Sequence, residues 1–272
     1  MRWPALHQRV FQIKTNMIKR EILYFRAALM FFTRLPAGHN INVGLQSAAR
    51  YLPMIGILVG ATGATVYYLG HLLFKDPYVA VVLSIVATLL MTGGFHEDGL
   101  ADVADGFGGG WTKEKILEIM KDPRTGAYGV MALVCSIGLK IFVLAKLGML
   151  LPDQFFLIYV CGHTISRVTP LYLMRFLAYA RLDGTSKIGA VNTAVSISAL
   201  TFATIIGFIP LAILGVEAAW ISAIPCATLT LYLGWYFQKW IDGYTGDCLG
   251  ATQQLNELIF YLCLLAIWNY TL

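Results

Sequence analysis

The sequence predicts an all-α, polytopic integral membrane protein: a helical bundle of about six to seven transmembrane helices with an N-terminal interfacial helix. Three observations lead to this prediction. Hydrophobic residues make up 58% of the 272 residues and charged residues only 13%, about half the charged share of an ordinary soluble domain. The mean hydropathy is +0.67. Apolar runs of roughly 20 residues, the length that crosses a bilayer as a helix, recur along the chain with short polar segments between them.

The first 50 residues carry eight of the twenty basic residues and one apolar stretch, residues 22–35. Because Arg26 and Arg34 interrupt that stretch, we predict that it lies in the membrane interface and does not cross the bilayer. Crossing is the less favoured alternative. The chain is therefore divided into a basic N-terminal interfacial segment, 1–50, and a transmembrane domain, 51–272, that holds all of the candidate site residues.

The transmembrane domain contains seven candidate spans, each an apolar run of membrane-crossing length. Their boundaries are soft by several residues, as boundaries read from sequence are. The spans cover residues 51–74, 77–95, 126–151, 155–177, 191–214, 218–238 and 255–270.

Basic side chains gather on one side of these spans. With a cytoplasmic N-terminus, sixteen Lys and Arg residues fall on the cytoplasmic side and only Lys75 on the opposite side. Cytoplasmic loops typically carry such an excess. We therefore expect the N-terminus and segments 96–125 and 239–254 all to lie on the cytoplasmic face. Anionic lipid head groups account for the net charge of +5, so no nucleic-acid partner is expected.

The most informative stretch is acidic and follows the second candidate span. Seven of the fifteen acidic residues lie between residues 97 and 122. On a helix, Asp98, Asp102 and Asp105 share one narrow face, where like charges repel. A divalent cation would remove this repulsion, and ligands that are all oxygen favour Mg²⁺ or Mn²⁺. A solvated acidic face without metal is the alternative.

Two more acidic residues extend this candidate site. Glu97 directly precedes Asp98, and Asp247 lies in a polar segment ahead of the last span, with Gln254 and Glu257 at roughly helical spacing behind it. The topology returns this segment to the face of Asp98, so a second helix could complete a site for one or two metal ions. The predicted metal ligands are Glu97, Asp98, Asp102, Asp105 and Asp247, and the predicted catalytic residues are Asp98, Asp102 and Asp105.

Basic residues supply candidates for phosphate binding. Lys121 and Arg124 lie in a turn with Pro and Gly ahead of the third span, within reach of the acidic helix, and such cations suit phosphate oxygens. Lipid head-group anchoring is the alternative. Arg167 and Lys140 lie near mid-depth in their spans, where a charge indicates a functional site. Both could hold a buried anion, or they could pair with a carboxylate or with backbone carbonyls elsewhere.

Four segments of the sequence together resemble the cobalamin synthase family, the adenosylcobinamide-GDP ribazoletransferases. The block MTGGFHEDGLADVADG at 91–106 carries most of the resemblance. In the family's order, FTRLP at 32–36 precedes it, and EIMKDPRTG with YG at 118–129 and GDCLGA at 246–251 follow. The similarity extends over nearly the whole chain from about residue 22.

The resemblance implies an integral enzyme of the bacterial or archaeal cytoplasmic (inner) membrane that depends on a divalent metal. It implies that the transmembrane domain joins adenosylcobinamide-GDP to α-ribazole, or to α-ribazole 5′-phosphate, and releases GMP in the late nucleotide-loop assembly of vitamin B12. The lipid bilayer would surround the protein. A homo-oligomer is compatible with the sequence.

The expected mechanism is metal-assisted attack on a diphosphate. Mg²⁺ at the carboxylates would bridge the GDP diphosphate, and Asp105 would accept the proton of the attacking ribazole hydroxyl. The main alternative is an ion-coupled transporter in which the acids bind the coupling ion and Arg167 an anionic substrate. Transporters usually place such sites at mid-membrane between repeats, whereas these acids lie at one face. A scaffold for other corrinoid enzymes is a third interpretation.

Overall fold

A computed structural model describes residues 3–38, 43–180, 194–215 and 217–271. Within these ranges the chain forms eleven helices, with one isolated backbone bridge between Tyr179 and Tyr244. The prediction of an all-α fold is therefore confirmed.

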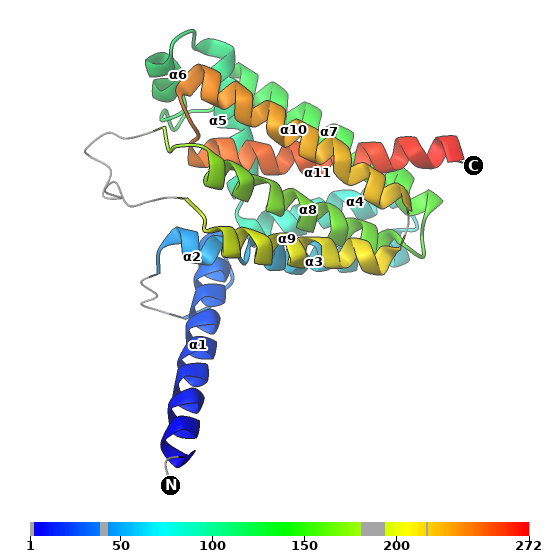
Figure 1. Ribbon diagram of the computed structural model, residues 1–272. Helices are drawn as coiled ribbons and strands as arrows, with labels where there is room; N and C mark the ends of the chain where they lie inside the picture. The colour runs from blue at the N-terminus through cyan, green and yellow to red at the C-terminus, as the bar shows by residue number, and fades with distance from the viewer. Residues whose placement is uncertain (1–2, 39–42, 181–193, 216, 272) are drawn as a thin grey trace.

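Seven helices run alongside one another through the length of the bundle (Figure 1). Three of the described helices, α3, α7 and α9, are long and apolar enough to cross a membrane, and the bent pair α4 and α5 adds a fourth if it counts as one span. The chain is thus a multi-pass membrane protein, while six to seven spans stay a prediction. The seven helices are α3 (Leu52–Phe74), α4 (Pro77–Thr92), α7 (Ala127–Leu150), α8 (Phe155–Phe176), α9 (Ile197–Leu214), α10 (Glu217–Ile241) and α11 (Gly246–Thr271).

The second candidate span ends earlier than the sequence predicted. Helix α4 stops at Thr92, and the chain bends by 91° into α5 (Phe95–Gly109). The bend falls at Gly93 and Gly94, whose φ angles of 75° and 69° lie in the left-handed region that favours glycine. The acidic block is therefore a separate helix set across the end of the bundle.

Two other predicted boundaries need correction. The last span was expected to begin at residue 255, but α11 begins at Gly246, so the polar segment before the span is already helical. The fifth span was expected to begin at residue 191, whereas α9 begins at Ile197; residues 191–193 lie outside the described part. Ser196 caps α9 by accepting a hydrogen bond from the backbone N–H of Ala199 at 3.2 Å.

Helix α1 (Trp3–Phe32) is longer than the apolar stretch that predicted it. Figure 1 shows α1 leaving the end of the bundle beside α2 (Leu45–Ala49) and extending across the direction of α3 and α9. Glu21 ties α1 to the segment before α3, because it accepts hydrogen bonds from Arg50 at 3.1 Å and from the Tyr51 hydroxyl at 2.7 Å. A helix that runs across the direction of the spans agrees with the predicted interfacial placement, which stays a prediction.

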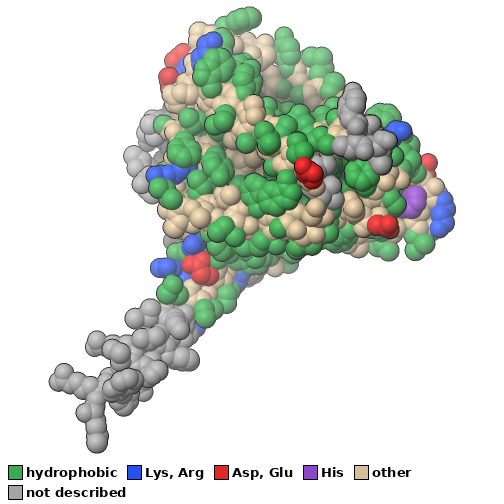
Figure 2. All heavy atoms as spheres, turned by 45° about the vertical axis from the view of Figure 1, so that its right-hand side comes forward, with side chains coloured by type: hydrophobic (Ala, Val, Ile, Leu, Met, Phe, Trp, Pro, Cys, Tyr) green, Lys and Arg blue, Asp and Glu red, His purple; other side chains and the backbone are tan. Residues whose placement is uncertain are grey.

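Close packing at the centre of the bundle depends on small residues. A Cβ atom on Gly56 would lie 2.5 Å from the carbonyl oxygen of His163, and one on Gly60 would lie 2.8 Å from the Cα of Val160. Helices α3 and α8 therefore touch backbone to backbone, as small residues allow in membrane bundles. Outward-facing side chains are largely apolar: Figure 2 shows hydrophobic groups spread over this face, with few charged ones, mostly near its edges.

Candidate active site

Helix α5 is held between the beginnings of α11 and α7. On one side a Cβ atom at Gly99 would lie 2.9 Å from the carbonyl oxygen of Asp247, so only glycine allows this approach to α11. On the other side a Cβ at Gly129 of α7 would lie 3.0 Å from the carbonyl oxygen of Ala101. The structure thus brings the two predicted polar segments, 96–125 and 239–254, to the same end of the bundle, as the sequence predicted.

The three aspartates that share one face of α5, Asp98, Asp102 and Asp105, lie in three different environments. Asp98 is exposed, Asp102 is half-buried and Asp105 is 8% exposed. The Asp105 carboxylate accepts hydrogen bonds from the backbone N–H groups of Gly126 at 2.7 Å and Gly129 at 2.9 Å. Both of its oxygens are therefore committed to the N-terminus of α7, a position where negative charge is stabilised. This geometry supports an anchoring role for Asp105, and its expected catalytic and metal-binding roles stay predictions.

The described residues contain no cluster of three or more His, Cys, Asp or Glu side chains arranged to hold a metal ion. The predicted set of five ligands is therefore not assembled as a closed cage. Mg²⁺ needs less than that, since it usually binds one or two carboxylates together with substrate phosphates and water. Glu97 adds a suitable donor, because its Oε1 accepts a hydrogen bond from Gln254 at 2.8 Å while its Oε2 is buried with no hydrogen-bond partner. The described residues therefore include carboxylate oxygens that could bind a magnesium ion, with substrate phosphates as its remaining ligands.

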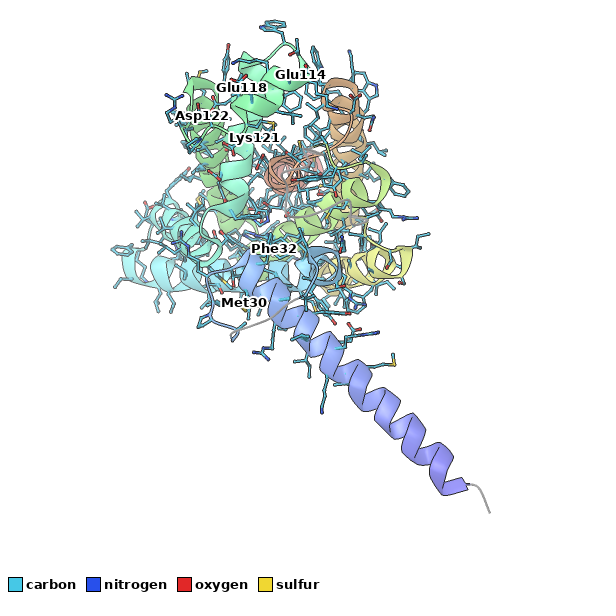
Figure 3. All side chains as sticks on the ribbon, turned by 90° about the vertical axis from the view of Figure 1, so that its left-hand side faces the viewer. Met30, Phe32, Glu114, Glu118, Lys121 and Asp122 are labelled. Atoms are coloured by element: carbon cyan, nitrogen blue, oxygen red, sulfur yellow. The ribbon has the colours of Figure 1, made fainter. Side chains whose placement is uncertain are left out.

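A cleft of about 1030 Å³ opens beside the acidic helix. We name it the α6–α7 cleft because its walls are the end of α5, helix α6 (Lys113–Ile119), the connection at residues 120–126 and the start of α7. Figure 3 shows Glu118, Lys121 and Asp122 gathered at α6 and the connection that follows it. Its volume suits a nucleotide-sized ligand.

Lys121 and Arg124 both line this cleft, where the sequence placed phosphate binding. The Arg124 guanidinium donates to Asp122 at 2.9 and 2.6 Å, and the Arg124 backbone N–H donates to the same carboxylate at 3.0 Å. These bonds lower the pKa of Asp122 to about 2. The Arg124 side chain is 86% exposed, so solvent screens the pair and its cation stays accessible to a phosphate.

Arg167 does not belong to this cleft. It is 2% exposed inside the bundle, and its Nη1 contacts the carbonyl oxygen of His163 at 2.9 Å and the Glu257 carboxylate at 3.9 Å. Lys140 pairs with the same carboxylate at 2.9 Å. The predicted phosphate-binding role of Arg167 is therefore not supported by the geometry, which instead realises the alternative of pairing with a carboxylate. The partner is on α11.

The polar interior contains residues that the sequence analysis did not single out. Gln253 donates from Nε2 to Ser166 at 2.9 Å and to Glu257 at 2.8 Å, and His163 Nδ1 lies 3.2 Å from Glu257. Their signal in the sequence is spacing, since polar residues four apart share a helix face and His163 precedes Arg167 by four. A buried polar group needs such partners inside a membrane.

The segment FTRLP at 32–36 lies against the hinge between α4 and α5. The backbone N–H of Arg34 donates to the carbonyl oxygen of Met91 at 2.8 Å, and a Cβ at Gly93 would come 2.6 Å from the Arg34 Nε. Phe31 and Phe95 meet edge to face at 5.6 Å. The end of α1 thus helps to fix the direction in which the acidic helix leaves the bundle.

Comparison with known proteins assigns the family. A family model described as cobalamin-5-phosphate synthase matches residues 24–265. Relatives called adenosylcobinamide-GDP ribazoletransferase include one from Shewanella amazonensis, 41% identical over 255 residues, which cover 92% of this chain and 98% of the relative. Two more, from Shewanella piezotolerans and Leptospira interrogans, are 39% identical and cover 92% and 93% of this chain and 97% and 99% of their own. No solved structure matches significantly. The chain therefore belongs to the cobalamin-5-phosphate synthase family.

Proposed function

We propose that this protein is an adenosylcobinamide-GDP ribazoletransferase. It joins adenosylcobinamide-GDP to α-ribazole, or to α-ribazole 5′-phosphate, to give adenosylcobalamin or its phosphate, and it releases GMP. Relatives with this activity in their names match more than nine-tenths of the chain. The observation that carries the proposal within the structure is a nucleotide-sized cleft lined by the end of α5, at Asp105 and Gly109, and by the Lys121–Arg124 segment. Asp98 and Asp102 lie earlier on the same helix and do not line this cleft.

In the proposed reaction the ribazole 5′-hydroxyl attacks the phosphorus attached to cobinamide. A phosphodiester bond forms, the phosphoanhydride bond breaks, GMP leaves with the electron pair of that bond, and the proton of the ribazole hydroxyl passes to water in the open cleft. Lys121 and Arg124 hold phosphate oxygens at the cleft wall, as positioned cations do in phosphoryl transfer. Asp98 and Asp102 are the proposed carboxylates for Mg²⁺ or Mn²⁺, with Glu97 and Asp247 beside them. Such an ion, when bound, neutralises charge on the diphosphate.

We further propose that the protein resides in the cytoplasmic (inner) membrane with its active site facing the cytoplasm. The bias of basic residues supports this orientation. The cleft is formed by the end of α5, by α6, by residues 120–126 and by the start of α7, and Figure 1 shows α5 and α6 at the end of the bundle from which α1 leaves. A water-soluble nucleotide reaches such a site without entering the hydrocarbon core.

The test is GMP release by the purified full chain in detergent micelles with both substrates and Mg²⁺. Asp98→Asn and Asp102→Asn are expected to lose metal-dependent release by about a hundredfold or more. Asp153→Asn is the matched control, because Asp153 is exposed in the turn between α7 and α8 at the far end of the bundle. Full activity in both site variants would refute the metal role.

The rival interpretation, an anion transporter, has a distinct signature. It requires uptake or counterflow of substrate into proteoliposomes without formation of GMP. The Arg167 position argues against it, since its guanidinium is enclosed by His163 and Glu257. Counterflow without product would favour the transporter nevertheless.

A further inference from the structure

The proposed function leaves open how the enzyme distinguishes guanine from other bases. The α6–α7 cleft has room for a whole nucleotide beyond the phosphate-binding residues. Its lining combines three cationic side chains with three carboxylates: Lys115, Lys121, Arg124, Asp105, Glu118 and Asp122. Cations suit the phosphates, so the carboxylates need a separate explanation.

Two of the three carboxylates have both oxygens hydrogen-bonded within the protein. Asp105 accepts the backbone N–H groups of Gly126 and Gly129. Asp122 accepts three hydrogen bonds from Arg124. Glu118 differs, because its one contact is an exposed pair between its Oε2 and the Lys115 ammonium at 3.1 Å. Among the described carboxylates that line the cleft, Glu118 therefore has the most capacity left to accept hydrogen bonds from a ligand.

The chemistry of this group matches one edge of guanine. An ionised carboxylate only accepts hydrogen bonds and has two oxygens side by side. Guanine presents two adjacent donors on its Watson–Crick edge, the N1–H and the 2-amino group. Adenine presents a bare N1 acceptor there, which would face the carboxylate without a proton between them. A carboxylate at the base position thus attracts guanine and rejects adenine, which is how recognition gains specificity.

The same cleft is also lined by an aromatic ring, whose face can contact a base. Tyr128, the second residue of α7, is 51% exposed and lines the cleft. The ring lies against Gly108 of α5, where a Cβ atom would come 2.6 Å from the Tyr128 Cγ. Contact with α5 fixes the ring and leaves part of it exposed. Bases stack on such exposed aromatic rings regardless of their identity.

We propose that Glu118 recognises the guanine edge of the nucleotide and that Tyr128 stacks on the base, while Lys121 and Arg124 hold the phosphates. Glu118 is thereby a specificity-determining residue and Tyr128 a binding residue that does not discriminate between bases. The proposal rests on the proposed function for its ligand, a guanosine diphosphate moiety. It assigns separate parts of one cleft to charge, stacking and base identity.

The experiment measures equilibrium binding of GDP, ADP and IDP, each at the same Mg²⁺ concentration, to the purified full chain in detergent micelles. Unmodified protein is expected to bind GDP about tenfold or more tighter than ADP, the discrimination that one bidentate contact gives. Glu118→Gln should weaken GDP and leave ADP nearly unchanged, so that the ratio approaches one. Tyr128→Leu should weaken all three nucleotides by similar factors.

Glu114→Gln is the matched control, because Glu114 is an exposed carboxylate on the same helix that does not line the cleft (Figure 3). It should keep the preference for GDP. IDP tests the proposal without any mutation, since it lacks the 2-amino donor and should bind more weakly than GDP. This comparison holds even if Glu118→Gln fails to fold.

Three results would overturn the proposal: equal binding of GDP and ADP by the unmodified protein, equal binding of GDP and IDP, or an unchanged GDP preference in a folded Glu118→Gln variant. Failure of the proposed function looks different. There, the protein would release no GMP when given both substrates, yet could still prefer GDP over ADP through Glu118.

Discussion

Lys140 of α7 and Glu257 of α11 form an ion pair of 2.9 Å inside the bundle, where their side chains are 8% and 1% exposed. Charges removed from water in this way are costly unless they are paired and hydrogen-bonded. Glu257 meets this requirement through Lys140, His163 and Gln253. Together with His163 of α8, the pair links the three helices α7, α8 and α11.

Removing one partner of this pair should cost more stability than removing both. Lys140→Met leaves Glu257 buried without its closest cation, so we expect a loss of about 3–5 kcal/mol. Lys140→Met combined with Glu257→Gln should recover part of that loss, because the two paired charges are removed together, while Arg167 loses its carboxylate partner and keeps the His163 carbonyl oxygen. Unfolding of the variants in mixed micelles measures this coupling. Additive losses would show that the two residues do not stabilise each other.

Gln254 should act as a bridge between this pair and the active site. Its Oε1 accepts from Lys140 at 2.9 Å and its Nε2 donates to Glu97 at 2.8 Å. Gln254→Leu breaks both bonds, and we expect GMP release to fall by roughly 10- to 100-fold, since small misplacements of a site residue have effects of this size. Stability should drop by only about 1–3 kcal/mol.

The control for this prediction is Gln238→Leu, at an exposed position on α10. It should leave turnover unchanged. A Gln254→Leu variant with normal turnover would show that the reaction does not need Glu97 to be held by Gln254.

Substitutions of Asp105 test whether this residue holds the start of α7 in place or accepts a proton in the reaction. If its role is to hold the start of α7 through Gly126 and Gly129, Asp105→Ala should destabilise the protein by about 1–3 kcal/mol and expose the connection at 120–126 to proteolysis. Asp105→Asn, which keeps one acceptor oxygen, should retain part of that stability and of the activity. Thermal unfolding and limited proteolysis measure the first effect. An Asp105→Asn variant of unchanged stability with no activity would restore the proton-accepting role.

The Asp122 and Arg124 pair predicts a pH dependence. The folded-state pKa of Asp122 lies at about 2, below its ordinary value of 3.8. The stabilisation from this pair is therefore fully present above about pH 4 and is lost as the pH falls toward 2. Between pH 5 and 8 the pair stays ionised, so nucleotide affinity should not change through it.

Asp122→Asn checks this prediction in GDP-binding titrations at several pH values. Nucleotide affinity should change in magnitude, because Arg124 loses its partner, while the pH profile between 5 and 8 keeps its shape. A profile that flattens in Asp122→Asn would mean that Asp122 titrates in that range.

Local and compositional features were predictable from the sequence. Long apolar runs define membrane helices because the bilayer core leaves no other partner for backbone groups, so the helical class and the spans at α3, α7 and α9 followed directly. The spacing of Asp98, Asp102 and Asp105 placed them on one helix, and α5 contains all three. The topology also predicted that α5 and the start of α11 share one end of the bundle.

The roles of individual charges depended on contacts between distant segments. Asp105 and Asp98 look equivalent in the sequence, yet Asp105 accepts hydrogen bonds from the start of α7 and Asp98 is exposed. Arg167 and Arg124 were both predicted to bind phosphate, yet Arg167 is buried in the bundle and Arg124 lines the cleft. Sequence alone determined the membrane class, the helix content and the shared helix face of Asp98, Asp102 and Asp105, because these follow from interactions within one segment and its solvent. Tertiary structure alone decided which charges are neutralised, since each partner comes from another helix.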